Sequence, residues 1–299
     1  MNDLTRLLLV ANGNVATAAE LAACGVDGHG VHALVRRGEL VRVRSGAFVD
    51  GAAFRGGNTA VRHGLAVRAM LRRLPAHAAS HLSAVVLWDL PVVAAHLDRV
   101  HVSGVRSGRA RRSGRLVVHP PVHDDDVVRR DGVLLVSPTL AVLQTAGQSM
   151  TAGIIAADAA VRSGLTSRRR LVEAAEQRRF GFAAHRVAEL ASPRSESPGE
   201  SWTRLVLAGL GFDAEEQVAI HDEDGRLVAR VDFLLRRQGV VIEFDGAVKY
   251  AGADGREALV REKRREDALR GLGFRVVRLT WADLRHPERI LAMVGRAAA

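Results

Sequence analysis

The sequence predicts a multidomain α/β protein built from three parts. Its 299 residues, of which 47% are apolar, are enough for about two or three globular domains. Residues 3–50 contain signals for short helices followed by a hairpin, and residues 198–279 follow the order helix, strand, strand, strand, helix, strand. We therefore expect a first domain over residues 1–57, an α+β middle domain over residues 58–192 and an α/β module over residues 193–299.

The first domain is predicted to contain three short helices and a basic hairpin. The expected helices are Asp3–Ala11, a second one ending at Cys24, and Gly28–Arg37, and the expected strands are Leu40–Val43 and Ala47–Val49. Thr17 and Glu20 have the spacing of a capping box, and Asp27 can cap the third helix. Three helices followed by a basic hairpin form the usual layout of a winged helix-turn-helix, which reads a groove of duplex DNA.

Basic side chains on the third helix and the hairpin are the expected DNA contacts: His29, His32, Arg36, Arg37, Arg42 and Arg44. The alternative is a small helical domain for protein contacts with solvated basic residues, since Gly28 and Gly30 weaken the third helix. The wing, with its pattern Gly-x-Leu-Val-Arg-Val-x-x-Gly-x-Phe, resembles that of the AbiEi-type antitoxins. The resemblance implies a DNA-binding regulator. A toxin partner and a homodimer both stay open.

The charge is unevenly distributed along the chain. Residues 1–194 hold 26 basic and 15 acidic side chains, a net charge of +11, whereas residues 195–299 hold 17 and 18, a net charge of −1. An excess of this size favours a polyanionic partner for the N-terminal two thirds. An arginine-rich proteome would give the same total of +10, so the charge alone does not decide the partner.

The middle domain carries an arginine-rich segment between two predicted strands, Arg99–Ser103 and Leu116–His119. Its arginines stand on a Gly/Ser backbone, which predicts a flexible loop suited to phosphate contact or simply a solvated loop: Arg106, Arg109, Arg111, Arg112 and Arg115. Helices are expected over Arg62–Leu74 and Ser80–Trp88, a short strand over Gly132–Val136, then a helix capped by Ser137 and Ala-rich helices to about Leu190.

Two other features of the middle domain carry no predicted site. The pattern around Asp158 is interpreted as packing surface. Five histidines show no metal-ligand spacing: His77, His81, His101, His119 and His123. The Ser/Pro-rich stretch Ala191–Gly199 is the predicted linker to the last module.

The last module is organised around a predicted hairpin, Leu227–Leu235 and Val240–Phe244. Asp232 lies among apolar neighbours on the first strand, and Glu243 and Asp245 end the second. Carboxylates are depleted in strands and costly to bury unpaired, and oxygen ligands at one sheet edge suit Mg²⁺. The alternative is that Asp232 pairs with an arginine and that Asp245 only begins a turn.

The order Glu200, Asp232, Glu243 resembles the core of the PD-(D/E)XK nuclease superfamily, and the strings VDFLL, VVIEFDGAVKY and GFRVVRLTW resemble its branch related to very-short-patch repair endonucleases. The resemblance covers about residues 195–299 and implies a restriction-endonuclease-like fold with Mg²⁺ or Mn²⁺ on the carboxylates, Asp245 being a further candidate ligand. The family's lysine, two positions after Glu243, is Asp245 here, so the lysine's role has moved or the site is inactive.

The chain contains only two lysines, Lys249 and Lys263, and both lie in the nuclease-like module. A lysine is a compact charge whose pKa burial can lower, so either is a candidate catalytic residue. Lys249 follows the Glu243 strand, whereas Lys263 lies on the charged helix predicted over Arg256–Leu272, where i,i+4 pairing is the alternative. Glu200 has an alternative as well, because Ser197 and Glu200 form a capping box.

We interpret the sequence as a cytoplasmic, DNA-binding protein with a Mg²⁺-dependent endonuclease-like domain that hydrolyses phosphodiester bonds. The alternative is an antitoxin-like transcriptional regulator with a catalytically inactive nuclease fold. A single cysteine, Cys24, excludes a disulfide framework and fits a reducing compartment. The absence of a long apolar run predicts no membrane partner.

Overall fold

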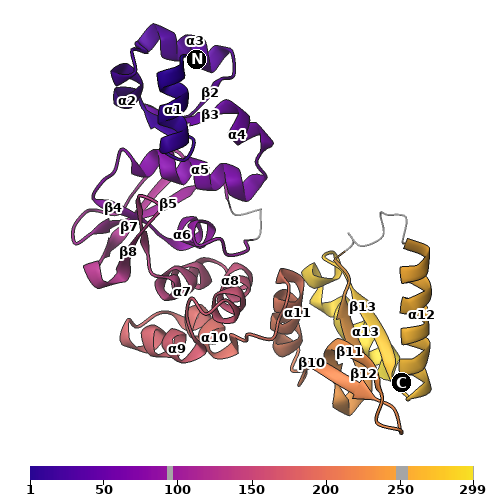
Figure 1. The fold of residues 1–299 in the computed structure, drawn as a ribbon. Helices are drawn as coiled ribbons and strands as arrows, with labels where there is room; N and C mark the ends of the chain where they lie inside the picture. The colour runs from indigo at the N-terminus through magenta and orange to yellow at the C-terminus, as the bar shows by residue number, and fades with distance from the viewer. Residues whose placement is uncertain (93–96, 247–254, 299) are drawn as a thin grey trace. The chain divides into compact units, whose positions relative to one another are not determined.

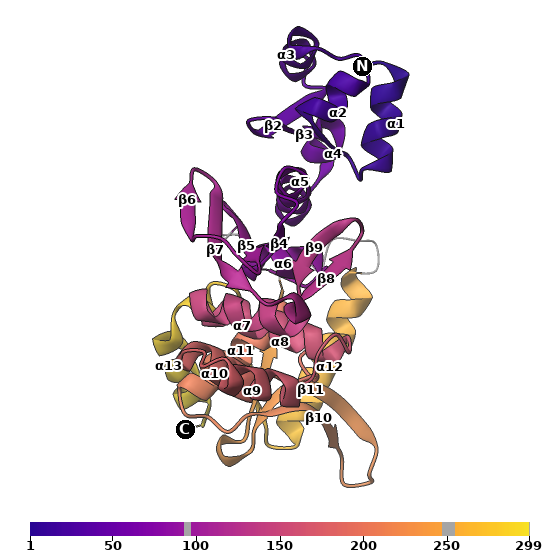
Figure 2. The same cartoon turned by 90° about the vertical axis from the view of Figure 1, so that its left-hand side faces the viewer.

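The computed structural model describes residues 1–92, 97–246 and 255–298. The chain divides into two compact units (Figures 1 and 2). Unit 1 comprises Met1–Ala156 and Ser163–Glu189, and unit 2 comprises Ala157–Arg162 and Leu190–Ala299. Each unit has its own hydrophobic core and is described by itself.

Unit 1 begins with the helices and hairpin expected from the sequence. The elements in order are α1 (Asp3–Ala11), β1 (Val15–Thr17), α2 (Ala18–Ala23), α3 (Gly28–Arg36), β2 (Leu40–Arg44) and β3 (Ala47–Asp50). The three helices and two of the strands were predicted, whereas β1 was not, because three residues are too short for a periodic signal. It pairs with β3, so that the wing becomes a sheet of order β1-β3-β2.

Capping side chains fix where the helices of this region start. Thr17 and Glu20 form the predicted capping box, in which the Thr17 N–H donates to the Glu20 carboxylate at 2.8 Å. Asp27 Oδ1 accepts the Gly30 N–H at 2.8 Å and so begins α3 despite its two glycines. One apolar cluster then joins the three helices to the sheet: Leu9, Ala16, Leu21, Val31, Leu34, Leu40 and Phe48.

Two further helices, α4 (Gly51–Gly56) and α5 (Thr59–Leu71), follow the wing. Leu65 and Ala69 of α5 pack with Val15, Ala47 and Val49 of the wing sheet. One side of α5 therefore packs against the wing sheet.

The middle of unit 1 is a six-stranded mixed sheet of order β6-β7-β5-β4-β9-β8. Its strands are β4 (His77–Ala79), β5 (Val100–Val105), β6 (Arg111–Ser113), β7 (Leu116–Val122), β8 (Val127–Arg130) and β9 (Val133–Val136). The helices of this region are α6 (His81–Leu87), α7 (Pro138–Gln148), α8 (Met150–Arg162), α9 (Arg168–Gln177) and α10 (Phe182–Leu190). The last part of α8, Ala157–Arg162, belongs to unit 2. The predicted helices and strands of this region agree with these within a few residues.

The arginine-rich segment differs from the predicted loop. Residues Arg111–Ser113 form β6, which pairs antiparallel with β7 through Arg111↔Val118 and Ser113↔Leu116. Gly114, at a φ of +56°, allows the tight turn between the two strands. The arginines therefore stand on a hairpin at one edge of the sheet (Figure 2).

Unit 2 has the predicted order of one helix, three strands, a helix and a strand. These are α11 (Pro198–Gly209), β10 (Glu215–His221), β11 (Leu227–Leu235), β12 (Val240–Phe244), α12 (Gly255–Gly271) and β13 (Arg275–Leu279), and an unpredicted α13 (Pro287–Ala298) follows. The sheet order is β10-β11-β12-β13, with antiparallel pairs except for the parallel pair β12–β13. The helix α12 lies between the two parallel strands in the chain, as a crossover requires.

Helices cover both faces of this sheet (Figure 1). On one face, Phe233, Ile242 and Leu279 pack against α11 and α13. On the other face, Val241 packs with Leu269 of α12. The run Val240–Ile242 of β12 is thus buried on both faces of the sheet, which explains why three hydrophobic residues follow one another there. In the described residues, no helix is long and apolar enough to cross a lipid bilayer.

A buried histidine ties α5 to the middle sheet. His63 is 5% exposed. In the tautomer that satisfies every partner, its Nδ1–H donates to the Leu97 carbonyl at 3.2 Å and its Nε2 accepts from the Ser83 hydroxyl at 2.9 Å. Ser83 Oγ accepts the His101 N–H at 2.8 Å. Burial lowers the pKa of His63 to about 4, against the raising influence of the Leu97 hydrogen bond and of Asp98.

This pKa predicts a loss of stability in acid. His63 binds its proton less readily in the folded than in the unfolded chain, so its contribution is present above the unfolded pKa of 6.5 and is lost as the pH falls toward 4. We expect the free energy of unfolding to fall by about 2 kcal/mol more in wild type than in His63→Gln between pH 7 and pH 5. Urea unfolding of both proteins at the two pH values checks this, and equal pH dependence would contradict it.

Candidate nucleic-acid interface and carboxylate site

The helix α3 presents one apolar and one basic face. Val31 and Leu34 are buried in the core of the region, whereas the predicted DNA contacts on this helix and after it are all exposed: His29, His32, Arg36 and Arg37. Arg37 is already partnered, since its Nε donates to Glu39 Oε1 at 2.7 Å. For His29, His32 and Arg36 the described residues provide no ion-pair partner. These three side chains are available for a ligand in solvent.

The wing places Arg42 and Arg44 beside each other along β2. Arg42 is exposed, and its guanidinium lies 5.5 Å from the ring centre of Phe48 on the neighbouring strand. This cation–π contact holds the side chain against the sheet. Arg44 Nη2 lies 3.4 Å from Ser113 Oγ of β6. The end of the wing and the arginine-rich hairpin therefore lie next to each other in unit 1.

The hairpin adds more basic groups to this region. Arg109, Arg111, Arg112 and Arg115 are exposed, and the described residues offer them no ion pair. Arg106 differs, because it forms an ion pair with Asp124 that raises its pKa. Of the five arginines predicted to contact phosphate, four are solvated on β6 and its flanks, and Arg106 is paired with Asp124.

In unit 2 the β11–β12 ladder ends at Phe233↔Ile242. Asp232 and Glu243 are the next residues of the two strands beyond this last pair. Asp232 Oδ2 accepts the Phe244 N–H at 2.9 Å. Asp232 thereby satisfies a backbone donor of β12 where the strand pairing stops, which is a structural reason for a carboxylate at this place.

Glu243 is held by arginines. It is 9% exposed, and Arg265 of α12 donates to its two oxygens at 2.6 and 2.7 Å. The Nη2 of Arg278, the residue paired with Glu243 on β13, lies 3.8 Å from its Oε2. Hydrogen bonds to Glu243 and Glu262 raise the pKa of Arg265, so this guanidinium stays charged. A bidentate pair of this kind is strong and geometrically specific.

Arg265 and Arg278 connect Glu243 to two more carboxylates of α12. Arg265 also donates to Glu262 at 2.6 Å, and Arg278 donates to Glu262 and, at 3.0 Å, to Glu266. The hydrogen bond from Arg265 is the main cause of a lowered pKa at Glu262. The face of α12 that carries Glu262 and Glu266 is therefore an ion-pair surface against β13.

Of the other predicted nuclease residues, Lys263 is exposed on α12, and Lys249 lies outside the described residues. The Asp245 N–H donates to the Leu279 carbonyl at 2.8 Å, which continues the β12–β13 pairing. Within the described ranges, no three of the carboxylates Glu200, Asp232, Glu243 and Asp245 come close enough to one another to share a metal ion.

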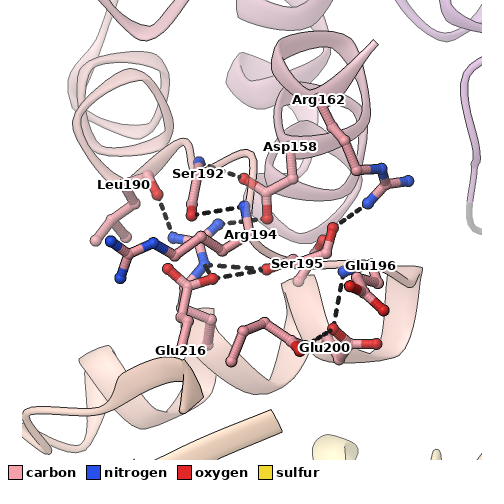
Figure 3. Close-up of polar contacts among 12 residues, drawn as sticks. Asp158, Arg162, Leu190, Ser192, Arg194, Ser195, Glu196, Glu200 and Glu216 are labelled. Carbon is pink, nitrogen blue, oxygen red and sulfur yellow. Dashed lines mark hydrogen bonds and ion pairs between the residues drawn. The ribbon is translucent and has the colours of Figure 1, made fainter. Parts of the chain in front are cut away.

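Glu200 caps a helix. The Ser197 hydroxyl accepts the Glu200 N–H at 3.2 Å, which is half of the predicted capping box. The other half is shifted by one residue, because Glu200 Oε2 accepts the N–H of Glu196 at 2.8 Å and Gln217 Nε2 at 3.0 Å (Figure 3). All of these contacts order the start of α11.

Next to Glu200 lies a buried ion pair that the sequence did not reveal. Asp158 is fully buried and binds Arg204 of α11, and it also accepts the Ser192 N–H at 2.9 Å (Figure 3). Arg204 Nε lies 3.3 Å from Glu216 and 3.4 Å from Ser195 Oγ. Burial raises the pKa of Asp158, opposed by Arg204 and the Ser192 N–H. The pattern around Asp158, interpreted as packing surface, is therefore a polar anchor for the segment before α11.

Two groups of residues at these sites were not predicted from the sequence. Arg265 could have been found, because Glu262, Arg265 and Glu266 stand at i, i+3 and i+4 and so share a helix face. The second group is a cluster of His81, His101 and His119, whose separations in the chain match no ligand motif. Only the fold brings these three together.

Comparison with known proteins supports the N-terminal interface. The family of AbiEi antitoxins, described as transcriptional regulators, matches residues 5–49, the segment from α1 to β3. Two proteins of Mycobacterium tuberculosis, from two strains, are each 32% identical to this chain over 194 residues, which cover 63% of the chain and 70% of the relative. The chain belongs to the family of these mycobacterial proteins. Both bear the name of uncharacterized proteins, and the antitoxin-type domain at residues 5–49 is the part with a described role.

The buried ion pair gives a prediction about stability. Asp158→Ala leaves the buried Arg204 guanidinium with Glu216 as its remaining carboxylate partner, and we expect a loss of about 3 kcal/mol, the lower end for breaking a buried pair, in the free energy of unfolding of unit 2. The double variant Asp158→Ala/Arg204→Met removes both charges and should lose less. Glu173→Ala, which breaks an exposed pair with Arg169, is the control and should cost under about 0.5 kcal/mol. Urea unfolding measures these differences in the free energy of unfolding. A double variant less stable than Asp158→Ala would contradict the expected role of the buried ion pair.

Proposed function

We propose that this protein is a DNA-binding transcriptional regulator of antitoxin type, with α3 and the wing as its duplex-binding surface. The observation that carries the proposal is the match of an antitoxin regulator family to the segment whose exposed face bears His29, His32, Arg36 and Arg42. A short helix that shows polar and basic groups, beside a wing with arginines, fits a DNA groove and its phosphates.

The surface extends onto the arginine-rich hairpin. Arg44 of the wing touches Ser113 of β6, and Arg111 and Arg112 are exposed on the same strand. We assign phosphate contacts to the hairpin, because its exposed guanidinium groups complement the charge of the DNA backbone, and base-edge contacts to α3.

Unit 2 then serves as a folded scaffold, because its central carboxylate is neutralised. Glu243 accepts both hydrogen bonds of Arg265, and Asp232 caps the Phe244 N–H. A cation that used these groups would have to displace the guanidinium, at the cost of a strong bidentate pair.

Substitution on the hairpin tests the DNA-binding surface. Each lost phosphate contact lowers the slope of log K against log salt by about 1, so Arg111→Gln/Arg112→Gln should lower it by about 2 and weaken binding equally to all sequences. Arg169→Gln, an exposed arginine of α9, is the matched control and should leave the slope unchanged. Fluorescence anisotropy with a short duplex over a salt series measures both. Equal slopes for all three proteins would exclude the hairpin from the interface.

A second function is favoured by one observation, that Asp232 and Glu243 both follow directly on the last pair of the β11–β12 ladder. In that case unit 2 is a Mg²⁺- or Mn²⁺-dependent endonuclease, with Asp232 and Glu243 as metal ligands, Glu200 and Asp245 as further ones, and Lys249 or Lys263 beside the water. The cation would lower the pKa of that water and stabilise the phosphate charge. Glu243 would first have to leave Arg265.

Cleavage of supercoiled plasmid separates the two functions. We expect no nicking in Mg²⁺, Mn²⁺ or EDTA by wild type, Asp232→Ala or Glu243→Ala, with DNA binding retained by all three. Arg265→Gln, which frees Glu243, should also be inactive if unit 2 is a scaffold. Asp267→Ala, an exposed carboxylate of α12, is the control. Metal-dependent nicking by wild type that is lost in both carboxylate variants, and kept in the control, would establish the nuclease instead.

A further inference from the structure

Three imidazoles from three elements meet in the middle domain of unit 1. His81 is the first residue of α6, His101 lies on β5 and His119 on β7. Strands β5 and β7 are parallel neighbours with Val102 opposite Val118 and Ser103 opposite His119. Residues two apart on a strand share a face, so His101 and His119 lie on the same side of the sheet.

The distances between the rings are short. His101 Nδ1 and His119 Nε2 are 2.8 Å apart. The His81 ring stacks on His119 with a centroid distance of 3.6 Å, and its centroid is 5.7 Å from that of His101. One ring nitrogen from each residue lies within 4.8 Å of the other two. Among the residues that the structure describes, this is the one group of three or more His, Cys, Asp or Glu with such geometry.

Two of the imidazoles are hydrogen-bonded to each other. His101 Nδ1 and His119 Nε2 are 2.8 Å apart, so one of these two nitrogens carries the proton between them. A cation between the two rings would replace this hydrogen bond. Burial is the main cause that lowers the pKa of His81 to about 2 and the pKa values of His101 and His119 to about 4.

Polar side chains contact the histidine cluster or share its strand face. His81 Nδ1 lies 3.1 Å from Ser80 Oγ, and a donor bond there leaves the lone pair on Nε2. Gln148 Nε2 lies 3.4 Å from His101 Nδ1. The hydroxyl of Ser103, which shares the strand face of His101, is fully buried and has no hydrogen-bond partner in the described part of the chain. Ser103 therefore offers a buried oxygen on the strand face that carries His101.

The backbone also holds His81 in an uncommon conformation. Its φ is +52°, a left-handed value that costs a residue with a side chain of this size about 1 kcal/mol or more. The His81 N–H is fixed by Gln144 Oε1 at 3.1 Å. The structure thus maintains a strained residue at the point from which its ring reaches His119.

We propose that His81, His101 and His119 form a binding site for a divalent transition-metal cation of the Zn²⁺ class. Three neutral imidazoles without thiolate or carboxylate suit Zn²⁺, Cu²⁺ or Ni²⁺ rather than Mg²⁺ or Ca²⁺. Two Zn–N bonds at a tetrahedral angle separate their nitrogens by about 3.3 Å, so His101 and His119 need to part by only about 0.5 Å. The cation ties the start of α6 to β5 and β7, beside the arginine-rich hairpin.

Metal binding by the full-length protein, stripped with EDTA and dialysed, tests the site. Isothermal titration with ZnCl₂ should show one Zn²⁺ per chain, and Co²⁺ should give the visible absorption of a low-symmetry nitrogen site. His101→Gln and His119→Gln should each lower the affinity at least about tenfold and abolish the rise in Tm that Zn²⁺ gives the wild type. Both measurements are independent of DNA binding or any enzymatic activity.

Matched controls keep the result interpretable. His123→Gln, an exposed histidine of the same domain, should bind Zn²⁺ as the wild type does. Urea unfolding in EDTA establishes which variants keep the fold, and His81→Gln serves if either strand variant does not. No stoichiometric Zn²⁺ binding and no Co²⁺ absorption by the wild type would overturn the proposal, as would folded cluster variants that bind as tightly as the wild type.

Discussion

A carboxylate that folding removes from water needs a positively charged partner, and arginine is that partner at three buried carboxylates of this chain. In the described part of the chain, Asp126 is bound by Arg178, Asp158 by Arg204 and Glu243 by Arg265. Each of these carboxylates is under 10% exposed, so the loss of its guanidinium would leave an uncompensated charge in a poorly solvated place. Arginine suits this task because it stays ionised and donates two parallel hydrogen bonds to a carboxylate.

The same constraint separates structural arginines from those that can meet a ligand. Arg178, Arg204 and Arg265 are committed to carboxylates inside the two units. The arginines of α3, the wing and β6 stand in solvent with few partners, and they lie in unit 1, where the basic excess of the chain is concentrated. A regulator whose antitoxin-type domain holds duplex DNA uses that excess, whereas a nuclease centre in unit 2 would have to break an ion pair first.

Local signals were enough to predict much of the fold. The Thr17–Glu20 capping box, the Asp27 cap and the β11–β12 hairpin follow from residues close together in the chain, and the structure has all three. Two features were missed for different reasons. Strand β6 is a three-residue strand of charged and polar side chains without apolar alternation, and the ion pair of Asp158 with Arg204 joins residues 46 apart in the chain. Partners at such separations leave no periodicity, so one sequence alone cannot assign them. The histidine cluster was missed for the same reason.

Hydrogen exchange measured by mass spectrometry, with and without a short random-sequence duplex at low salt, locates the surface that binds DNA. We expect slower exchange on α3, on β2 and β3, and on the β6–β7 hairpin, and no change on β11 and β12. Protection confined to β11, β12 and α12, with α3 and the wing unchanged, would contradict it and move nucleic-acid binding to unit 2.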